Sequence, residues 1–409
     1  MLSYSQIDVI NMQQASKLAI FRKIPATVWA MGFVGLIDKI SSVMVFNISP
    51  IYLTEVLGVS MLGVGMIETV VEFISWMMRI FSGVASDYLH KRKPVLLTAY
   101  GVIAASRFIF PLAPNATYIF LAKFVDRIGN GFQAAPREAL IGDIAPPDLK
   151  GSSYGLLKTL MMLGSTLGGV LLLVILHTTG NDYVFAFWVA AISPVLAIVI
   201  LVLFVKDKPT IAVTKTGKKK IFHLAHIKNL SRQYWVVVAV ASMFMVSNYS
   251  GAFMILQAKG AGITESFIPI VMVLQNVAAF LSAFPAGWLS DKIGRNKLLM
   301  LGFAIVILSN SLLAMTNAIV FVLAGVILWG MQMGITQSLL SAKIADNAPE
   351  DVRGSAFGIY YVCNAVALLI GNVAAGHISH SYSLEWVFHA SSGVALLALV
   401  GLFVIKDNK

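Results

Sequence analysis

The chain has 409 residues, of which 58% are hydrophobic and only 12% carry a charge, whereas typical soluble domains are about 45–50% apolar and about a quarter charged. This composition excludes an ordinary soluble enzyme and a disordered chain, and the single cysteine, Cys363, excludes a disulfide scaffold. The net charge of +11 would favour nucleic acid as the partner of a soluble protein, but in a membrane protein basic residues report topology. We therefore expect an all-α protein that crosses a membrane several times and binds no nucleic acid.

Twelve segments each supply the roughly 20 apolar residues that a transmembrane helix needs. In the first half of the chain they are residues 27–54, 62–85, 94–112, 117–140, 152–176 and 183–205. In the second half they are residues 234–256, 266–289, 297–315, 319–342, 355–378 and 384–405. These segments predict twelve transmembrane helices in two six-helix bundles, an N-terminal one over residues 25–206 and a C-terminal one over residues 233–409.

Two segments lie outside the predicted bundles. Residues 1–24 have neither the apolar core nor the cleavage site of a signal peptide, so we expect an N-terminal cytoplasmic segment that is either an interfacial helix or a disordered tail. The stretch from Lys206 to Arg232 holds eight basic residues and one acid, Asp207. This composition predicts a basic cytoplasmic linker over residues 207–232 that lies on membrane lipids. Most other basic residues fall in loops on the same side, which places both termini in the cytoplasm.

The two halves of the chain repeat each other. Residues 139–155 align with residues 342–358 at an offset of 203, and nine of the seventeen aligned positions are identical, including Asp143 with Asp346. Halves of six spans that repeat in the same orientation predict two bundles related by an axis along the membrane normal. We expect a central site between them.

A basic motif follows the eighth predicted span and recurs in degraded form after the second. Its residues are Gly287, Asp291, Lys292, Gly294 and Arg295 in the first case and Gly83, Asp87, Lys91 and Arg92 in the second. Glycine permits close helix approach, an aspartate pairs or caps at a helix end, and basic residues anchor at the inner membrane surface. We expect the two loops to form a cytoplasmic gate. The motif resembles the G-x-x-x-D-[RK]-x-G-[RK]-x-[RK] signature of the major facilitator superfamily.

The fourth predicted span resembles the same superfamily. Arg127 begins an R-x-x-x-G pattern whose arginine the resemblance associates with proton transfer. Residues 126–140 are also similar to the pattern D-R-x-G-x-G-x-x-x-x-P-R-[DE]-A-L of a poorly assigned bacterial group of permeases, although Val43, Asn130 and Gln133 stand where an acid and two bases would be. The resemblance implies a multi-pass transporter of the bacterial inner membrane, with drugs and siderophore-like metabolites among the suggested cargoes.

Ionisable residues within the predicted spans cost about 2.5–3.5 kcal/mol each on insertion scales and are therefore functional candidates. We identify Asp38, Lys39, Glu68, Glu72, Arg79, Arg107, Lys123, Asp126, Arg127 and Lys158, all in the first half. Helical spacing places Glu68, Glu72 and Arg79 on one face, and Arg107 lies toward the outer side. The predicted proton-coupling network comprises Asp38, Glu68, Glu72, Asp126 and Arg127. One carboxylate would exchange protons while Arg127 or Lys123 serves as its counter-charge; permanent helix-to-helix ion pairs are the alternative.

The balance of these charges bears on the cargo. Six cations against four acids, together with the suitability of arginine for carboxylates, favour a small anionic or carboxylate-bearing solute such as a metabolite or siderophore. The predicted substrate-binding residues are Arg107, Lys123 and Arg127 in the first half and Asn248, Tyr249, Gln275, Asn276 and Gln332 in the second.

We expect a monomeric, proton-coupled secondary transporter that works by alternating access. Multidrug/proton antiport of lipophilic compounds is the alternative, although the fifth span lacks the proline of the antiporter pattern. A membrane-bound enzyme or a receptor is the alternative of a different class. The sequence contains no P-loop and no common hydrolase motif, which excludes an ATP-driven pump. It predicts no cofactor and no metal site, because the pair His377 and His380 has no third ligand.

Overall fold

The computed structural model describes residues 22–89, 91–207, 230–249, 251–263, 269–315 and 318–405, and all regular secondary structure in these ranges is helical. Most of the predicted N-terminal segment 1–24 and most of the predicted linker 207–232 lie outside the described residues.

Long helices make up the described part of the first half. They are α2 (Ala26–Ile51), α3 (Met61–Leu89), α4 (Lys93–Ile109), α5 (Ala116–Ile144), α6 (Lys150–Thr179) and α7 (Tyr183–Phe204). Pro50 lies in the last turn of α2, and the chain continues as a short π-helix, Tyr52–Val56. Because proline has no amide hydrogen, the regular bonding of α2 is interrupted where the wider helix begins.

The second half is helical in the same way. Its described helices are α9 (Arg232–Val246), α10 (Gly251–Gly260), α11 (Pro269–Ile293), α12 (Arg295–Met315), α13 (Ile319–Asn347), α14 (Arg353–Ser381) and α15 (Leu384–Gly401). Eight of the described helical segments are long and apolar enough to cross a membrane, as an all-α membrane protein requires. Three helices are shorter, since α4, α9 and α10 have 17, 15 and 10 residues. The count of twelve spans therefore stays a prediction.

One predicted span is interrupted. The sequence predicts a continuous helix over residues 234–256, but α9 ends at Val246 and α10 begins at Gly251. At the break, the Ser247 hydroxyl and the Asn248 side-chain amide both donate to the carbonyl oxygen of Phe244, at 2.6 Å and 2.9 Å. Such side-chain bonds give the backbone an alternative to the helical ladder. The expectation of an unbroken helix was wrong here, and the break holds two of the predicted substrate-binding residues.

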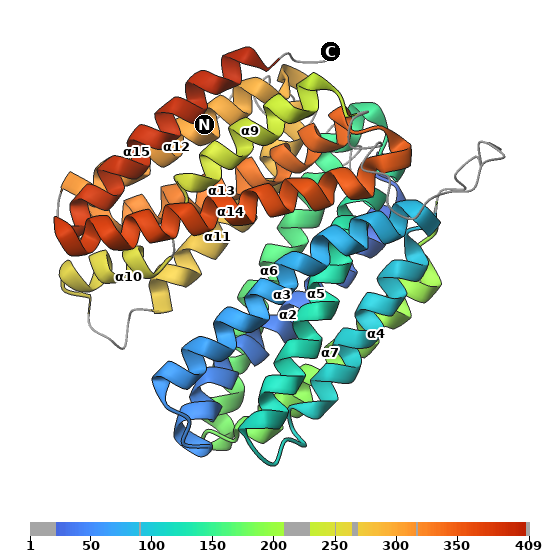
Figure 1. Ribbon diagram of the computed structural model, residues 1–409, viewed down its shortest axis with the longest axis vertical. Helices are drawn as coiled ribbons and strands as arrows, with labels where there is room; N and C mark the ends of the chain where they lie inside the picture. The colour runs from blue at the N-terminus through green and yellow to red at the C-terminus, as the bar shows by residue number, and fades with distance from the viewer. Residues whose placement is uncertain are drawn as a thin grey trace, which may run out of the picture.

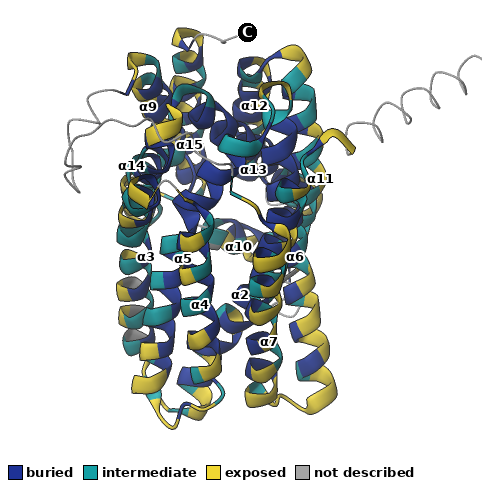
Figure 2. Cartoon of the chain, turned by 90° about the vertical axis from the view of Figure 1, so that its right-hand side faces the viewer, coloured by how far each residue is buried: buried dark blue, intermediate teal, exposed yellow. Residues whose placement is uncertain are grey.

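The helices of the two halves form two groups that meet at one end of the molecule and diverge toward the other (Figure 1). We call the place where they meet the linker end, because α7 ends there at Phe204 and α9 begins there at Arg232. Both α5 and α13 continue past the predicted apolar runs, to Ile144 and Asn347. These extra turns carry polar residues to the linker end, and exposed residues gather on the outer faces and at the opposite end (Figure 2).

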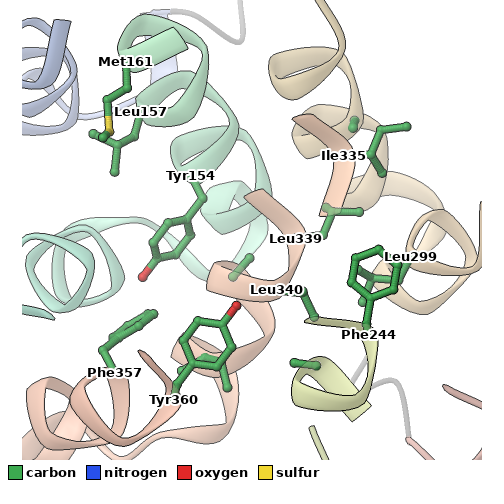
Figure 3. Packing of buried hydrophobic residues seen from close by; sticks show 14 of the residues in the cluster. Tyr154, Leu157, Met161, Phe244, Leu299, Ile335, Leu339, Leu340, Phe357 and Tyr360 are labelled. Carbon is green, nitrogen blue, oxygen red and sulfur yellow. The ribbon is translucent and has the colours of Figure 1, made fainter. Parts of the chain in front are cut away.

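The buried apolar residues show the same arrangement. One cluster joins the second half to the linker-end part of the first half, and Tyr154 of α6 faces Phe357 and Tyr360 of α14 within it (Figure 3). The rings of Tyr154 and Phe357 lie 6.3 Å apart. A second cluster, which includes Ile48 and Phe187, contains residues of the first half alone and lies at its other end. The halves therefore share an apolar core that includes the linker end, and the first half has a separate core beyond it.

Candidate functional site

The N-terminus of α6 is capped by a carboxylate from the other half. Asp291, near the end of α11, accepts hydrogen bonds from the amides of Gly151 (2.8 Å) and Ser152 (2.7 Å) and from the Ser152 hydroxyl (2.7 Å). The first amides of a helix lack intrahelical partners and carry the positive end of its dipole, so a carboxylate is favoured there. The helices approach this closely because Gly287 has no side chain; a Cβ atom there would collide with the carbonyl oxygen of Gly151.

The repeated loop makes the equivalent contact on the other side of the interface. Asp87, near the end of α3, accepts hydrogen bonds from the amides of Gly354 (3.0 Å) and Ser355 (2.6 Å) at the start of α14. A Cβ atom on Gly83 would collide with the Gly354 carbonyl. The glycine and aspartate of both predicted gate loops therefore lie between the halves.

Additional charges link these caps to the neighbouring loops. Arg92 pairs with Asp87, and its Nε lies 3.1 Å from Oδ2 of Asp143, which also pairs with Arg353 of the second half. Burial lowers the pKa of Arg92, but the adjacent carboxylates of Asp87 and Asp143 outweigh burial and raise it, so the guanidinium stays charged.

The second half repeats this arrangement. Arg295 pairs with Asp346 and lies 3.9 Å from Asp291, and Lys150 of the first half lies 3.3 Å from Asp346. Sequence reasoning did not assign Asp143 and Asp346 to the gate, although their identity at aligned positions of the repeat was the available signal. We call these contacts the linker-end network, which consists of Asp87, Arg92, Asp143, Lys150, Asp291, Arg295, Asp346 and Arg353.

The remaining predicted gate residues lie around this network. Lys91 is exposed. The Lys292 ammonium lies 4.0 Å from the ring centre of Trp288. Gly294 joins α11 to α12 with a φ of 97°, a backbone conformation that disfavours any residue with a Cβ atom.

Three ion pairs that involve the predicted network residues lie deeper in the first half. Arg107 of α4 pairs with Asp126 of α5 at 2.9 Å, and its Nη2 also donates to the hydroxyl of Ser42 on α2 at 3.1 Å. Both charged side chains are almost fully buried. Although the sequence places Arg107 toward the outer side, its long side chain reaches the carboxylate. A buried pair of this kind joins three helices and is costly to break by removing one partner.

The other two pairs join α3 to α5. Lys123 pairs with Glu68 and donates to the hydroxyl of Ser49 at 2.8 Å. The Nε of Arg127 lies 3.5 Å from Glu72. The predicted acidic face of α3 therefore faces α5. The two acids lie one helical turn apart on α3, and each pairs with a cation of α5.

The aspartate of α2 has a different environment. The Oδ2 atom of Asp38 accepts a hydrogen bond from the side-chain amide of Gln133 at 3.2 Å, and Oδ1 is buried without a hydrogen-bond partner. Gln133 in turn accepts from the hydroxyl of Tyr100 at 2.5 Å and from Arg137 at 3.0 Å. In the described part of the chain, Asp38 is thus buried, hydrogen-bonded to a neutral amide, and outside the ion pairs.

Sequence reasoning missed a further buried group. Glu138 is fully buried in α5 and pairs with Lys158 of α6 at 2.5 Å and with Arg137 at 3.7 Å. Both Arg137 and Glu138 lie inside the span predicted over residues 117–140, so their charge was the available signal.

The predicted neutral residues of the second half divide into separate contacts. Gln332 donates to Asn248 at 3.3 Å, and Tyr249 donates to Asn310 at 2.7 Å. The Gln275 amide lies 3.8 Å from the sulfur of Met333, and its Oε1 is buried without a hydrogen-bond partner. Asn276 donates to the carbonyl of Met272 at 2.9 Å. Each of these bonds stays within the second half. In the described ranges, no three histidine, cysteine, aspartate or glutamate side chains gather as a metal site would require.

Comparison with known proteins decides the family. Residues 31–258 and 236–409 match the family described as the Major Facilitator Superfamily. The chain belongs to this superfamily. A similar protein, an uncharacterized MFS-type transporter of Methanocaldococcus jannaschii, is 28% identical over 94% of this chain and 96% of its own length. The galactose-proton symporter of Escherichia coli is 31% identical over 32% of this chain and 28% of its own length.

Solved structures show the same fold. A transporter of the superfamily, FucP in its outward conformation, has a TM-score of 0.79 at 12% identity and covers 93% of this chain and 99% of its own. The human organic anion transporter MFSD10 has a TM-score of 0.73 at 15% identity and covers 92% of this chain and 99% of its own. The protein is therefore a multi-pass membrane transporter with a small-molecule substrate, and it is not an enzyme.

Proposed function

We propose that this member of the superfamily is a proton-coupled secondary transporter of a small organic anion that carries carboxylate. It works as a monomer in a bacterial inner membrane and belongs to the permease group whose pattern covers residues 126–140. Its twelve spans form bundles over residues 25–206 and 233–409, joined by the linker 207–232, with both termini in the cytoplasm. The linker end is then the cytoplasmic end of the molecule.

The observation that carries the proposal is the group of ionisable residues that lie between helices of the first half. Arg107 with Asp126, Lys123 with Glu68, and Arg127 with Glu72 each place a carboxylate beside a cation. Asp38 has no such cation in contact. A carboxylate without a cationic partner gains most by taking up a proton, which makes Asp38 the proton-exchanging residue of this network.

Alternating access follows from the linker-end network. The two aspartate caps fasten α6 to α11 and α14 to α3 while the halves diverge at the other end. This arrangement is the outward-open state if the linker end is cytoplasmic. Opening toward the cytoplasm requires both caps to separate, and closing on the outer side brings the diverging halves together around the cargo.

A sugar or polyol is the second candidate cargo. The galactose-proton symporter of Escherichia coli is similar over part of the chain, and another solved structure with this fold is the fucose:proton symporter of Escherichia coli. The amide side chains of Asn248 and Gln332 are of a type that binds hydroxyl groups. The surplus of cations in the first half favours the anion, and the human organic anion transporter MFSD10 shares the fold. Export of lipophilic compounds is the third possibility for the cargo.

Transport by the purified chain in proteoliposomes tests the proposal. Radiolabelled succinate, citrate, galactose, fucose and tetraphenylphosphonium are each offered with and without an imposed pH gradient, and a protonophore serves as the control. We expect accumulation of an organic anion that collapses when the protonophore is added. Gradient-driven movement of the sugars alone would select the second candidate, and movement of the phosphonium cation alone would select multidrug transport.

A further inference from the structure

Two partly buried cations of the first half are outside the ion pairs. Within the described residues, neither Lys39 of α2 nor Arg79 of α3 forms an ion pair with a carboxylate, whereas Arg107, Lys123 and Arg127 each form one. The Nε atom of Arg79 is buried without a hydrogen-bond partner. A cation that is partly removed from water without a carboxylate partner is costly, so an anion from outside the chain would be stabilised beside it.

Ring contacts fix the orientation of Arg79. Its guanidinium carbon lies 3.7 Å from the ring centre of Trp76 on the same helix and 4.9 Å from that of Tyr361 on α14. A guanidinium whose faces contact rings can still donate from its N–H groups to a planar carboxylate. Because Tyr361 belongs to the other half, a ligand at this edge lies where the two halves meet.

The charges around Arg79 do not cancel. Lys39, Arg79 and Arg137 lie close enough to influence one another electrostatically, and Lys158 lies close to Arg79 and Arg137. Arg127 is a fifth cation of this group, and its carboxylates are Asp38, Glu72 and Glu138. Five cations against three carboxylates leave two positive charges. The three deeper ion pairs, in contrast, are neutral in sum.

The position of this group also matters. The backbone of Arg79 packs against Gly358 of α14, where a Cβ atom on the glycine would lie 3.0 Å from the Arg79 carbonyl oxygen. Four residues farther along α3 lies Gly83, where α3 contacts Gly354 in the linker-end network. The charges therefore lie just beyond the closed end, at the place from which the two halves diverge.

We propose that Lys39 and Arg79 form the anion-binding subsite of the transporter and that its ligand carries two carboxylates. This inference rests on the proposed function and names the residues that recognise its cargo. Arg107, Lys123 and Arg127 already pair with carboxylates, so they are less suited to bind the substrate than the two cations that form no ion pair. Tyr361 of the opposite half lies beside Arg79, so a bound dicarboxylate would lie next to residues of both halves.

Equilibrium binding to the full-length protein tests this subsite. Labelled succinate and citrate are measured against diethyl succinate and galactose as neutral competitors, for the natural protein and for Arg79→Gln, Arg79→Lys and Lys39→Gln. Arg232→Gln is the matched control, because Arg232 is exposed at the start of α9. Size-exclusion profiles identify variants that fail to fold, and Arg79→Lys retains the charge if Arg79→Gln does not fold.

We expect the dissociation constants of succinate and citrate to rise about 10- to 100-fold in Arg79→Gln and Lys39→Gln. The rise should be smaller in Arg79→Lys, which keeps the charge but loses the planar fork, and absent in Arg232→Gln. Unchanged constants in the glutamine variants, or no dicarboxylate binding by the natural protein, would overturn the subsite. If either of these negative results is accompanied by proton-coupled galactose flux, proton-coupled transport is still supported and only the subsite is wrong. Dicarboxylate binding that depends on Arg79 without any proton-coupled flux would support the subsite and contradict the proposed function.

Discussion

Individual charged residues in the first half have unequal environments, and these differences separate their roles. Arg107 and Asp126 are buried against each other, so each is needed to neutralise the other. Asp38 is buried beside a neutral amide. Removing one charge of an ion pair leaves the other charge without its partner. Asp38 contacts no cation, so removing its charge does not have this effect. Stability and proton coupling should therefore respond differently to substitutions at the two aspartates.

Substitution of Asp126 should affect stability first. Asp126→Asn leaves Arg107 as a buried charge with no carboxylate, and we expect a loss of about 3–5 kcal/mol in the free energy of unfolding. The double variant Arg107→Gln with Asp126→Asn should recover a large part of that loss. Thermal unfolding in detergent measures both. A single variant as stable as the natural protein would show that the pair is not a structural unit.

Substitution of Asp38 should affect coupling first. Asp38→Asn is isosteric and can keep its contact with Gln133, so we expect a change in stability of less than about 1 kcal/mol. Proton-driven accumulation of cargo should be lost, while exchange of labelled for unlabelled cargo across the membrane should continue. Asp148→Asn, at an exposed position, is the control. Accumulation that persists in Asp38→Asn would remove this residue from the mechanism.

At the scale of helices, the interface depends on glycine pairs that permit backbone contact. A Cβ atom on Gly287 would collide with the carbonyl of Gly151, and the same holds for Gly83 and the carbonyl of Gly354. Such contacts put the helix N-termini within reach of the aspartate caps. The close approach of α6 to α11 and of α3 to α14 is therefore a condition for the linker-end network.

Adding one methyl group at this interface should open it. Gly287→Ala is expected to push α6 away from α11 and shift the population toward states in which the linker end is open. Spin labels at the exposed positions 148 and 351, in a Cys363→Ser background, report the distance between the halves by double electron–electron resonance. Gly169→Ala is the matched control, since a Cβ atom there meets nothing within 4 Å. Equal distance distributions for Gly287→Ala and the natural protein would contradict this role of the glycine.

Sequence patterns predicted helix faces better than helix neighbours. The spacing of Glu68 and Glu72 placed both on one face of α3, and that face is the one that contacts α5. The partner of Asp126 was not evident, because the pairing with Arg107 depends on how α4 packs against α5 and on the reach of a long side chain. Packing between helices is a tertiary property that helical periodicity does not contain.

Two further differences have similar causes. The break between α9 and α10 arises from Ser247 and Asn248 bonding to the carbonyl of Phe244, which an apolar run does not reveal. The gate loops were found from their motif, but Asp143 and Asp346 join them only because α5 and α13 extend beyond the apolar segments. Hydropathy locates the membrane-crossing part of a helix and is insensitive to its polar extension.

In the molecule as a whole, the two caps join the halves at the linker end, and we expect them to hold that end closed together. Asp87→Asn and Asp291→Asn each remove one charge from hydrogen bonds to helix amides, and such charge-assisted bonds contribute about 1.5–3 kcal/mol each. We expect each single variant to shift the distance between positions 148 and 351 toward longer values, and the double variant to shift it further. A double variant with the natural distance distribution would show that the caps do not control this equilibrium.

We expect cargo and protons to move together through the first-half charges. This coupling is tested by imposing only a gradient of the transported anion across proteoliposomes that contain an internal pH dye, with no initial pH difference. We predict that the anion gradient drives a pH change inside the vesicles and that Asp38→Asn abolishes this change while anion exchange continues. Anion flux by the natural protein without any movement of protons would contradict proton coupling.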